Sequence, residues 1–290
     1  MDVEKVVHTG GCHCKSVRWK VVAPSSVVAW DCNCSTCYMR ANTHFIVPAN
    51  NFELLGDSEK FLTTYTFGTH TAKHTFCKIC GITSFYRPRS NPDGVAVTFR
   101  CVDPGTLTHV EIRYFDGKNW DSAYTQTDEN VKLSSSNLKA AKSVCIPATL
   151  QKPEMDAEKV WHTGGCHCKS VRRKVIAPSS VVAWDCNCPN CYMKVIAPSS
   201  AVNFELLGDS HKFLTTYTFG THTAKHTFCK ICGITSFYYH PRSNTDGIAV
   251  TFKGVDPGTL THVEIRHADG KNWERAVIET DIASYSKVQK

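Results

Sequence analysis

The sequence lacks the features that would place it in or across a membrane. No segment approaches the roughly 18 consecutive apolar residues that a membrane-spanning helix needs. The N-terminal stretch MDVEKVVHTGG carries acidic residues where a secretory signal is basic, and no apolar region follows it. We therefore predict a cytoplasmic or nuclear protein that is neither secreted nor membrane-bound. Thiols stay reduced in those compartments, so the 16 cysteines predict metal ligands rather than a disulfide framework.

The sequence also lacks the long basic runs that mark nucleic-acid-binding tails. Its formal net charge is +7, but the lysines and arginines are scattered along the chain. If fourteen cysteine thiolates bound four Zn2+ ions, these groups would together carry −6 and lower the formal charge from +7 to about +1. We therefore do not expect nucleic acid to be a general partner, although local basic patches remain open. Nothing in the sequence identifies a protein partner.

Long helical periodicity is missing as well. Instead, short segments rich in Val, Thr, Tyr and Phe alternate with clusters of Gly, Pro, Asn and Asp, which is typical of strands joined by turns. The clearest predicted strands are residues 16–22, 61–67, 83–86, 95–99 and 108–114. The predicted fold class is mainly β, built from small sheet-based domains with cysteine-bearing turns.

The chain contains two copies of one domain. The segment Phe61–Tyr86 recurs without a change at Phe213–Tyr238, and TGGCHCKSVR recurs with a period of about 154 residues, starting at Thr9 and at Thr163. That period is far longer than a solenoid or propeller repeat, so each copy should close its own core. We predict two domains arranged as beads on a string, with a polar linker between them that can form a short helix at 136–142. The predicted boundaries are copy 1, residues 1–130; the linker, residues 131–155; and copy 2, residues 156–285.

Seven cysteines recur in each copy, as one CxC pair, one CxCxxC run and one CxxC pair followed by glycine. In copy 1 they are Cys12, Cys14, Cys32, Cys34, Cys37, Cys77 and Cys80. In copy 2 they are Cys166, Cys168, Cys186, Cys188, Cys191, Cys229 and Cys232. Cys101 and Cys145 fall outside the shared pattern. Seven ligands divide naturally into a closed site of four cysteines, typical of structural zinc, and an open site of three, typical of catalytic zinc.

The spacing alone does not decide which other cysteines share a metal site with the CxxC pair. We prefer that Cys32, Cys34 and Cys37 stay together, because their close spacing can wrap one face of a single ion. Two other interpretations of these cysteines fit the sequence less well. Buried cysteines that merely fill a core do not explain an ordered spacing that occurs twice, and a thioredoxin-like redox pair at Cys77 and Cys80 lacks the surrounding βαβ pattern.

These motifs resemble a known family. GGCHCKSVRW, DCNCSTCYM, THFIVP, the long segment ending in SFYRPRSNPDG and the later GKNW are similar to the CENP-V/GFA domain, which centromere protein V shares with glutathione-dependent formaldehyde-activating enzymes. The resemblance covers nearly all of both copies and is closest to centromere protein V, through HTFCKICG, SFYRPRSNPDG and THFIVP. It implies two tandem Mss4-like (β-tent) zinc-binding domains.

The resemblance also implies how the cysteines divide. The structural zinc of copy 1 would be held by Cys12, Cys14, Cys77 and Cys80, and its catalytic zinc by Cys32, Cys34 and Cys37. The matching cysteines of copy 2 would hold two more ions. The structural ion would be bound by Cys166, Cys168, Cys229 and Cys232, and the ion of the open site by Cys186, Cys188 and Cys191. The expected cofactor is thus Zn2+, two per domain and up to four per chain. The enzyme branch of the family joins glutathione and formaldehyde, which is carbon-sulfur lyase chemistry.

The sequence does not reveal a general base. The CxCxxC run contains no carboxylate, and Asp31 just before it is as well suited to capping a turn. His70 and His74 share one face of a predicted strand; they can serve a pocket, but we favour ordinary polar positions on a half-exposed sheet.

Copy 2 departs from copy 1 after its CxCxxC run. Residues 194–202 replace the stretch that contains THFIVP and shorten it by two, so that His44 and Phe45 have no counterpart. We expect the loss of this strand to remove one wall of the copy 2 pocket, which leaves the activity of copy 2 open.

The leading predicted function is a zinc-dependent carbon-sulfur lyase acting on a small thiol/aldehyde adduct such as S-hydroxymethylglutathione, with a small thiol such as glutathione as partner. The alternative is a non-enzymatic zinc scaffold, or a binding module associated with centromeres or chromatin. A rate measurement with thiol and aldehyde separates the two interpretations.

Overall fold

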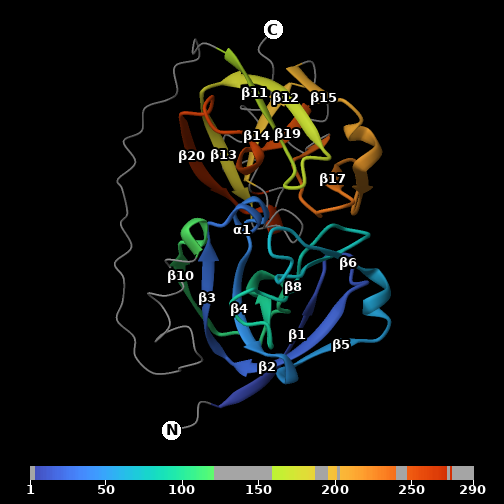
Figure 1. Ribbon diagram of the computed structural model, residues 1–290, viewed down its shortest axis with the longest axis vertical. Helices are drawn as coiled ribbons and strands as arrows, with labels where there is room; N and C mark the ends of the chain where they lie inside the picture. The colour runs from blue at the N-terminus through green and yellow to red at the C-terminus, as the bar shows by residue number, and fades with distance from the viewer. Residues whose placement is uncertain are drawn as a thin grey trace.

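The computed structural model describes residues 4–120, 159–186, 195–200, 203–239, 247–272 and 275. The predicted linker at 131–155, with its short helix at 136–142, lies outside these residues. Within them the protein is mainly β, as the sequence predicted, and its two copies form the lower and upper halves of the molecule (Figure 1).

Copy 1 is built from short strands that form a three-stranded sheet in the order β1-β2-β5, a five-stranded sheet in the order β10-β3-β4-β9-β8, and the pair β6-β7. Its strands are β1 Lys5–Gly11, β2 Arg18–Pro24, β3 Ser26–Cys32, β4 Thr43–Pro48, β5 Phe52–Leu55, β6 Leu62–Tyr65, β7 His74–Cys77, β8 Phe85–Tyr86, β9 Gly94–Thr98 and β10 His109–Phe115. Its helices are α1 Ser35–Arg40 and the 3-10 turns η1 Ala49–Asn51, η2 Ser58–Phe61, η3 Phe99–Cys101 and η4 Gly117–Asn119.

Copy 2 repeats this arrangement. Its sheets are the three-stranded β11-β12-β15 and the seven-stranded β16-β17-β18-β19-β14-β13-β20. The seven-stranded sheet combines the counterparts of two separate sheets of copy 1, the five-stranded sheet and the β6-β7 pair. The strands are β11 Lys159–Gly165, β12 Arg172–Pro178, β13 Ser180–Cys186, β14 Val195–Ser200, β15 Phe204–Leu207, β16 Leu214–Tyr217, β17 Lys225–Cys229, β18 Phe237–Tyr239, β19 Gly247–Thr251 and β20 His262–Ala268. The 3-10 turns are η6 Ser210–Phe213, η7 Phe252–Gly254 and η8 Gly270–Asn272.

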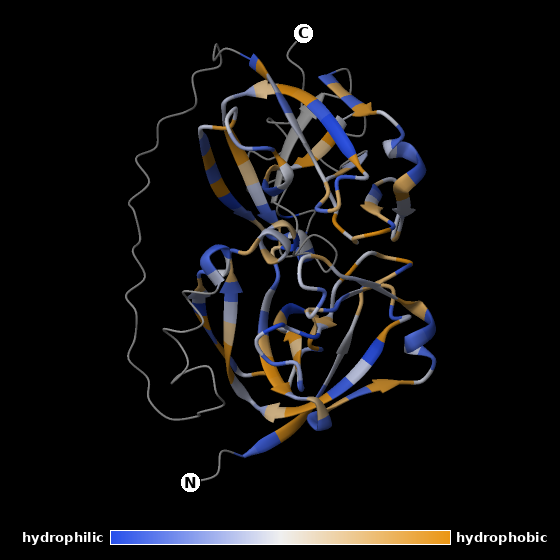
Figure 2. Cartoon of the chain, viewed as in Figure 1, coloured by the Kyte–Doolittle hydropathy of each residue, from blue (hydrophilic) through white to orange (hydrophobic). Residues whose placement is uncertain are grey.

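Alternation along the strands places each core. In β2 the side chains of Trp19, Val21 and Ala23 are buried, while the residues between them are partly exposed. Figure 2 shows the matching alternation of hydrophobic and hydrophilic segments along the strands of both halves. The core of copy 1 gathers these residues around the buried Cys12, Cys77 and Cys80, so one cysteine cluster lies inside the apolar core.

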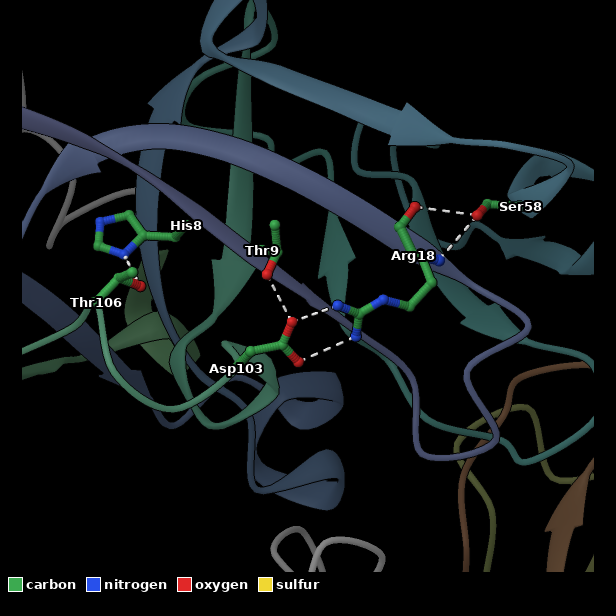
Figure 3. Close-up of polar contacts among 6 residues, drawn as sticks. All are labelled: His8, Thr9, Arg18, Ser58, Asp103 and Thr106. Carbon is green, nitrogen blue, oxygen red and sulfur yellow. Dashed lines mark hydrogen bonds and ion pairs between the residues drawn. The ribbon is translucent and has the colours of Figure 1, made fainter.

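A polar latch fixes the β1-β2 hairpin to the loop that precedes β10. Arg18 and Asp103 form a bidentate ion pair, in which Arg18 Nη1 donates to Asp103 Oδ1 at 3.0 Å, and Thr9 Oγ1 donates to Asp103 Oδ2 at 2.6 Å (Figure 3). His8 Nδ1 lies 2.8 Å from the hydroxyl of Thr106 in the same loop. Copy 2 repeats the latch at matching positions, including the pair Arg172 and Asp256. The two copies thus close in the same way.

The two copies pack against each other, and the expectation of separate beads on a string was wrong. Phe76 and Phe228 are almost fully buried, and their rings are 6.3 Å apart. Each ring covers the glycine that follows the CxxC pair of the other copy, where an added Cβ on Gly81 or Gly233 would lie 2.7 or 2.6 Å from ring carbons. The repeated HTFCKICG segment therefore serves as an interface as well as a cysteine motif.

Two further expectations about local structure need correction. Each of the five predicted strands of copy 1 overlaps an observed one, but helix α1 inside the CxCxxC run was not expected. In copy 2 a strand does form where we expected THFIVP to be lost. Strand β14 pairs with β13 and β19 as β4 pairs with β3 and β9, because residues 195–200 still supply β-prone Val and Ile at its start.

Candidate metal centres

Each copy brings four cysteines from two distant parts of the chain into one cluster. In copy 1 these are Cys12, Cys14, Cys77 and Cys80, and in copy 2 they are Cys166, Cys168, Cys229 and Cys232. The CxC pair lies in the turn after the first strand of each copy, and the CxxC pair begins at the last residue of β7 or β17.

The geometry of these clusters fits a tetrahedral ion. Cys14 Sγ lies 3.5 Å from Cys12 Sγ and 3.6 Å from Cys77 Sγ, and copy 2 repeats both separations. A zinc ion with Zn–S bonds of about 2.3 Å holds tetrahedral sulfurs about 3.8 Å apart. These cysteines are free thiols, so the separation suits thiolates around an ion. Gly81 and Gly233 have φ of +74° and +69°, the left-handed conformation that lets the knuckle turn back beneath the sulfurs.

Cys32, Cys34 and Cys37 form a third cluster, whose sulfurs lie within 4.8 Å of one another. Cys32 ends β3, Cys34 is the N-cap of α1, and Cys37 lies in its first turn. The Cys34 sulfur accepts a hydrogen bond from the backbone N–H of Cys37 at 3.4 Å, so a thiol replaces the usual Ser or Asp cap. Thus the structure keeps the CxCxxC run together, as we preferred from spacing.

The crowded sulfurs of this cluster strongly perturb each other's ionisation. Hydrogen bonds with Cys32 and then Cys37 lower the pKa of the Cys34 thiol, while the bond to Cys34 raises the pKa of the Cys32 thiol. Hydrogen bonds with Cys32 and Cys34 raise the pKa of the buried Cys37 thiol. Three thiols this close together can all lose their protons only beside a cation. Three thiolates are also a set of ligands that zinc accepts.

The loop after β10 covers the three-cysteine cluster. Strand β10 runs parallel to β3 with Phe115 opposite Cys32, so the GKNW segment that follows must lie beside the sulfurs. Asn33 anchors this loop, because its Oδ1 accepts from the backbone N–H of Lys118 at 2.9 Å and its side-chain amide donates to Asp116 Oδ1 at 2.8 Å. At Gly117 an added Cβ would lie 2.4 Å from Cys32 Sγ, so the loop passes where only glycine fits.

A cavity of about 410 Å³ opens onto this cluster. Its walls come from the five-stranded sheet, from β7 and from the loops that follow β6, β8 and β10, and they include aromatic rings and the cationic side chains of Arg89 and Lys118. Among the described residues, its lining contains no carboxylate. The volume and the mixture of apolar walls with a few polar groups are typical of small-molecule sites.

Two histidines that face this cavity are held neutral by burial. His44 Nε2 bonds the hydroxyl of Tyr86 at 2.9 Å, and the ring of Tyr86 stacks on His74 at 5.1 Å. Burial lowers the pKa of His44 to about 4 and of His74 to about 3, and it raises the pKa of Tyr86 well above its usual value.

Two predictions for candidate bases were therefore wrong. His74 starts β7 and lies buried in the cavity wall rather than on a half-exposed sheet, because Phe67 and Tyr86 stack on its ring. His70 lies in the preceding loop with φ of +59°, outside the strand. Asp31 lies within β3 and is exposed, so it does not cap a turn. In the sequence His44 stands out only as a residue without a counterpart in copy 2, and no motif links it to the cysteines.

Copy 2 differs at the same place. Ile196 pairs with Trp184 and Thr251, as His44 pairs with Trp30 and Thr98, so an isoleucine occupies the register position of His44. Cys186 ends β13 and is buried. Cys188 and Cys191 lie outside the described residues, as do residues 194, 201 and 202 of the altered segment.

Fold and sites together define a tandem, mainly β protein whose domains carry cysteine clusters able to hold metal. The family model described as "Glutathione-dependent formaldehyde-activating enzyme" matches residues 7–116 and 161–273, and the chain belongs to this family as a tandem duplication. A crystal structure of a Rhodobacter sphaeroides protein is similar at 32% sequence identity, covering 36% of this chain and 99% of that chain with a TM-score of 0.31. The particular likeness to centromere protein V stays a prediction.

The described part of the chain contains no helix that is both long and apolar enough to cross a membrane. The matched ranges lie inside the predicted domains 1–130 and 156–285, whose exact boundaries stay predictions.

Proposed function

We propose that copy 1 joins a small thiol to formaldehyde, and splits the adduct in the reverse direction, at the open Cys32–Cys34–Cys37 cluster. The observation that carries this proposal is the cavity above these three sulfurs, since a closed structural site has no need of one. Family membership supports glutathione as the thiol. The four-cysteine clusters would hold structural zinc, which makes two ions per domain if copy 2 also keeps its open site.

The reaction balances without an oxidant or reductant. The thiol sulfur forms a bond to the aldehyde carbon, the carbonyl π bond becomes a C–O single bond, and the thiol proton ends on that oxygen. The reverse reaction breaks the carbon-sulfur bond, which makes it a lyase. A zinc ion bound by the three cysteines would lower the pKa of a thiol, or polarise a carbonyl, at its fourth position.

The residues around the cluster would orient the substrate. Arg89 and Lys118 line a cavity whose described lining has no carboxylate, so it favours an anionic ligand such as glutathione with its two carboxylates. The aromatic walls exclude water from the reacting carbon. His44 and His74 have pKa values too low for efficient proton transfer at neutral pH, so they would act as neutral hydrogen-bonding and stacking groups.

The test is the rate at which glutathione and formaldehyde exchange with S-hydroxymethylglutathione, followed by NMR exchange spectroscopy at equilibrium. We expect the full chain to accelerate exchange and the Cys32→Ser/Cys34→Ser/Cys37→Ser variant to lose that acceleration. The same acceleration by both proteins would refute the assignment of chemistry to this cluster.

A scaffold role is the second candidate, and it applies to copy 2. The isoleucine at the register position of His44 favours it, because an isoleucine side chain cannot form the counterpart of the His44–Tyr86 hydrogen bond. The corresponding triple serine variant at Cys186, Cys188 and Cys191 should then leave the exchange rate unchanged.

A further inference from the structure

Helix α1 carries two of the three cysteines of the open cluster, and both of its ends are bound to copy 2. At its first residue, Ser35 Oγ lies 2.9 Å from His167 Nε2. At its last residue, the guanidinium of Arg40 donates to the carbonyl oxygen of Cys232 and, at 2.5 Å, to Thr83 Oγ1 of its own copy. His167 lies between Cys166 and Cys168, so both contacts come from loops of the same four-cysteine cluster.

The Arg40 contact is a buried charge, because the side chain is only 4% exposed. Among the described residues, no carboxylate lies within ion-pair distance of its guanidinium. Burial lowers the pKa of Arg40, and the negative charges of Cys232, of Cys37 in its own copy and of Cys229 oppose that shift. Four thiolates around one Zn2+ carry a net charge of −2, which supplies the compensation that a buried cation needs. Arg40 of copy 1 thus complements the metal cluster of copy 2.

The His167 contact reaches the cavity wall. Its Nδ1 lies 2.8 Å from the hydroxyl of Tyr65, and its ring lies 4.4 Å from that of Phe67. Phe67 and Ser35 both line the cavity of copy 1. One side chain of copy 2 therefore orients the start of α1 and one aromatic wall.

Part of this arrangement is reciprocal, and part is not. His13, at the position of His167 in copy 1, bonds the hydroxyl of Tyr217 at 2.7 Å and packs on Phe219 at 4.3 Å. The sequence positions that match Ser35 and Arg40, however, are Pro189 and Lys194. Proline offers no side-chain hydrogen bond, and lysine cannot reproduce the planar fork of arginine.

We propose that the four-cysteine cluster of copy 2 is a working part of the copy 1 site: through His167 and the Cys232 carbonyl it clamps both ends of α1 and fixes the geometry of Cys34 and Cys37. His167 and Arg40 are positioning residues. The proposal rests on zinc binding at Cys32, Cys34 and Cys37, as proposed above. It gives copy 2 a role that does not depend on chemistry at its own open site.

The test measures zinc retained by the full chain during titration with a competing chelator. The ion held by the open cluster of copy 1 is identified by comparison with the Cys32→Ser/Cys34→Ser/Cys37→Ser variant. We expect His167→Ala to weaken zinc binding at this cluster about 3- to 10-fold, the usual effect of one hydrogen bond. His167→Gln, whose amide can reach Ser35 in the place of Nε2, should restore most of it. His13→Ala is the matched control and should leave it unchanged.

Arg40→Met keeps the apolar stem and removes the charge, so it should weaken the same ion about 10- to 150-fold, as expected for a charged hydrogen bond. Arg100→Met, which breaks the cross-copy ion pair between Arg100 and Asp185 at 3.9 Å, is its control. Retention of both four-cysteine ions by a variant shows that it has folded.

Wild-type affinity in His167→Ala, or equal losses in His167→Ala and His13→Ala, would overturn the clamp even if the open cluster binds zinc and is active. A wild-type chain with no zinc at Cys32, Cys34 and Cys37 would instead refute the proposed function, and this inference with it. The two failures are thus distinguished in one titration series.

Discussion

Replacing Gly117 by alanine should damage the open cluster of copy 1 without touching any of its cysteines. The added Cβ would lie 2.4 Å from Cys32 Sγ and 2.8 Å from Cys34 Cβ, well inside the range where atoms must move. The φ angle of Gly117 lies outside the left-handed range, so the effect comes from space rather than from backbone strain. Either η4 shifts outward or the sulfurs lose their arrangement.

Overpacking of this kind costs about 1–3 kcal/mol. If the cost falls on metal binding, zinc affinity at Cys32, Cys34 and Cys37 drops about 5- to 150-fold, since 1.4 kcal/mol is tenfold. The assay is chelator competition on the full chain, with exchange of the glutathione adduct measured on the same samples. Gly270→Ala, the equivalent change in copy 2, is the control and should leave the copy 1 ion in place.

Wild-type zinc affinity and exchange rate in Gly117→Ala would refute the placement of the GKNW loop over the cysteines. A loss of all zinc ions together would show general unfolding and would equally contradict a local effect.

The remaining predictions concern single residues. Burial lowers the pKa of His44 to about 4, whereas the unfolded chain takes up this proton below about pH 6.5, so His44 alone should lower the free energy of unfolding by on the order of 3 kcal/mol as the pH falls from 6.5 to 4. His44→Ile should lack that loss in urea unfolding with excess zinc, and parallel pH curves for the two proteins would contradict the assignment. Lys118→Ala should weaken glutathione binding by about 1.5- to 5-fold in calorimetry, as one exposed ion pair predicts, with Lys271→Ala unchanged; equal effects would argue against the copy 1 cavity. Cys101→Gly, which installs the residue of copy 2, should keep every zinc ion, and loss of one would show that Cys101 is a ligand.

Much of the fold could be predicted because its signals are local. Strands such as β2 and β9 combine β-branched and aromatic residues with turn residues at their ends, and the cysteine spacing recurs in both copies. The composition of the clusters followed from that spacing and from the family resemblance.

The parts that could not be predicted depend on contacts between distant residues. The parallel pairing of β10 with β3 brings Phe115 beside Cys32, and no local pattern encodes that register. Helix α1 is too short to show a periodicity, and its cap is a cysteine rather than a residue that normally marks a helix start. The packing of the copies depends on His13 and His167, which look in the sequence like ordinary residues between ligands.

The zinc content of the full chain, with and without the open cluster, tests the central claim most directly. Elemental analysis should show that Cys32→Ser/Cys34→Ser/Cys37→Ser removes one zinc ion per chain while the four-cysteine clusters keep theirs. An unchanged zinc content would contradict an open metal centre in copy 1, and with it the catalytic role proposed for this cavity.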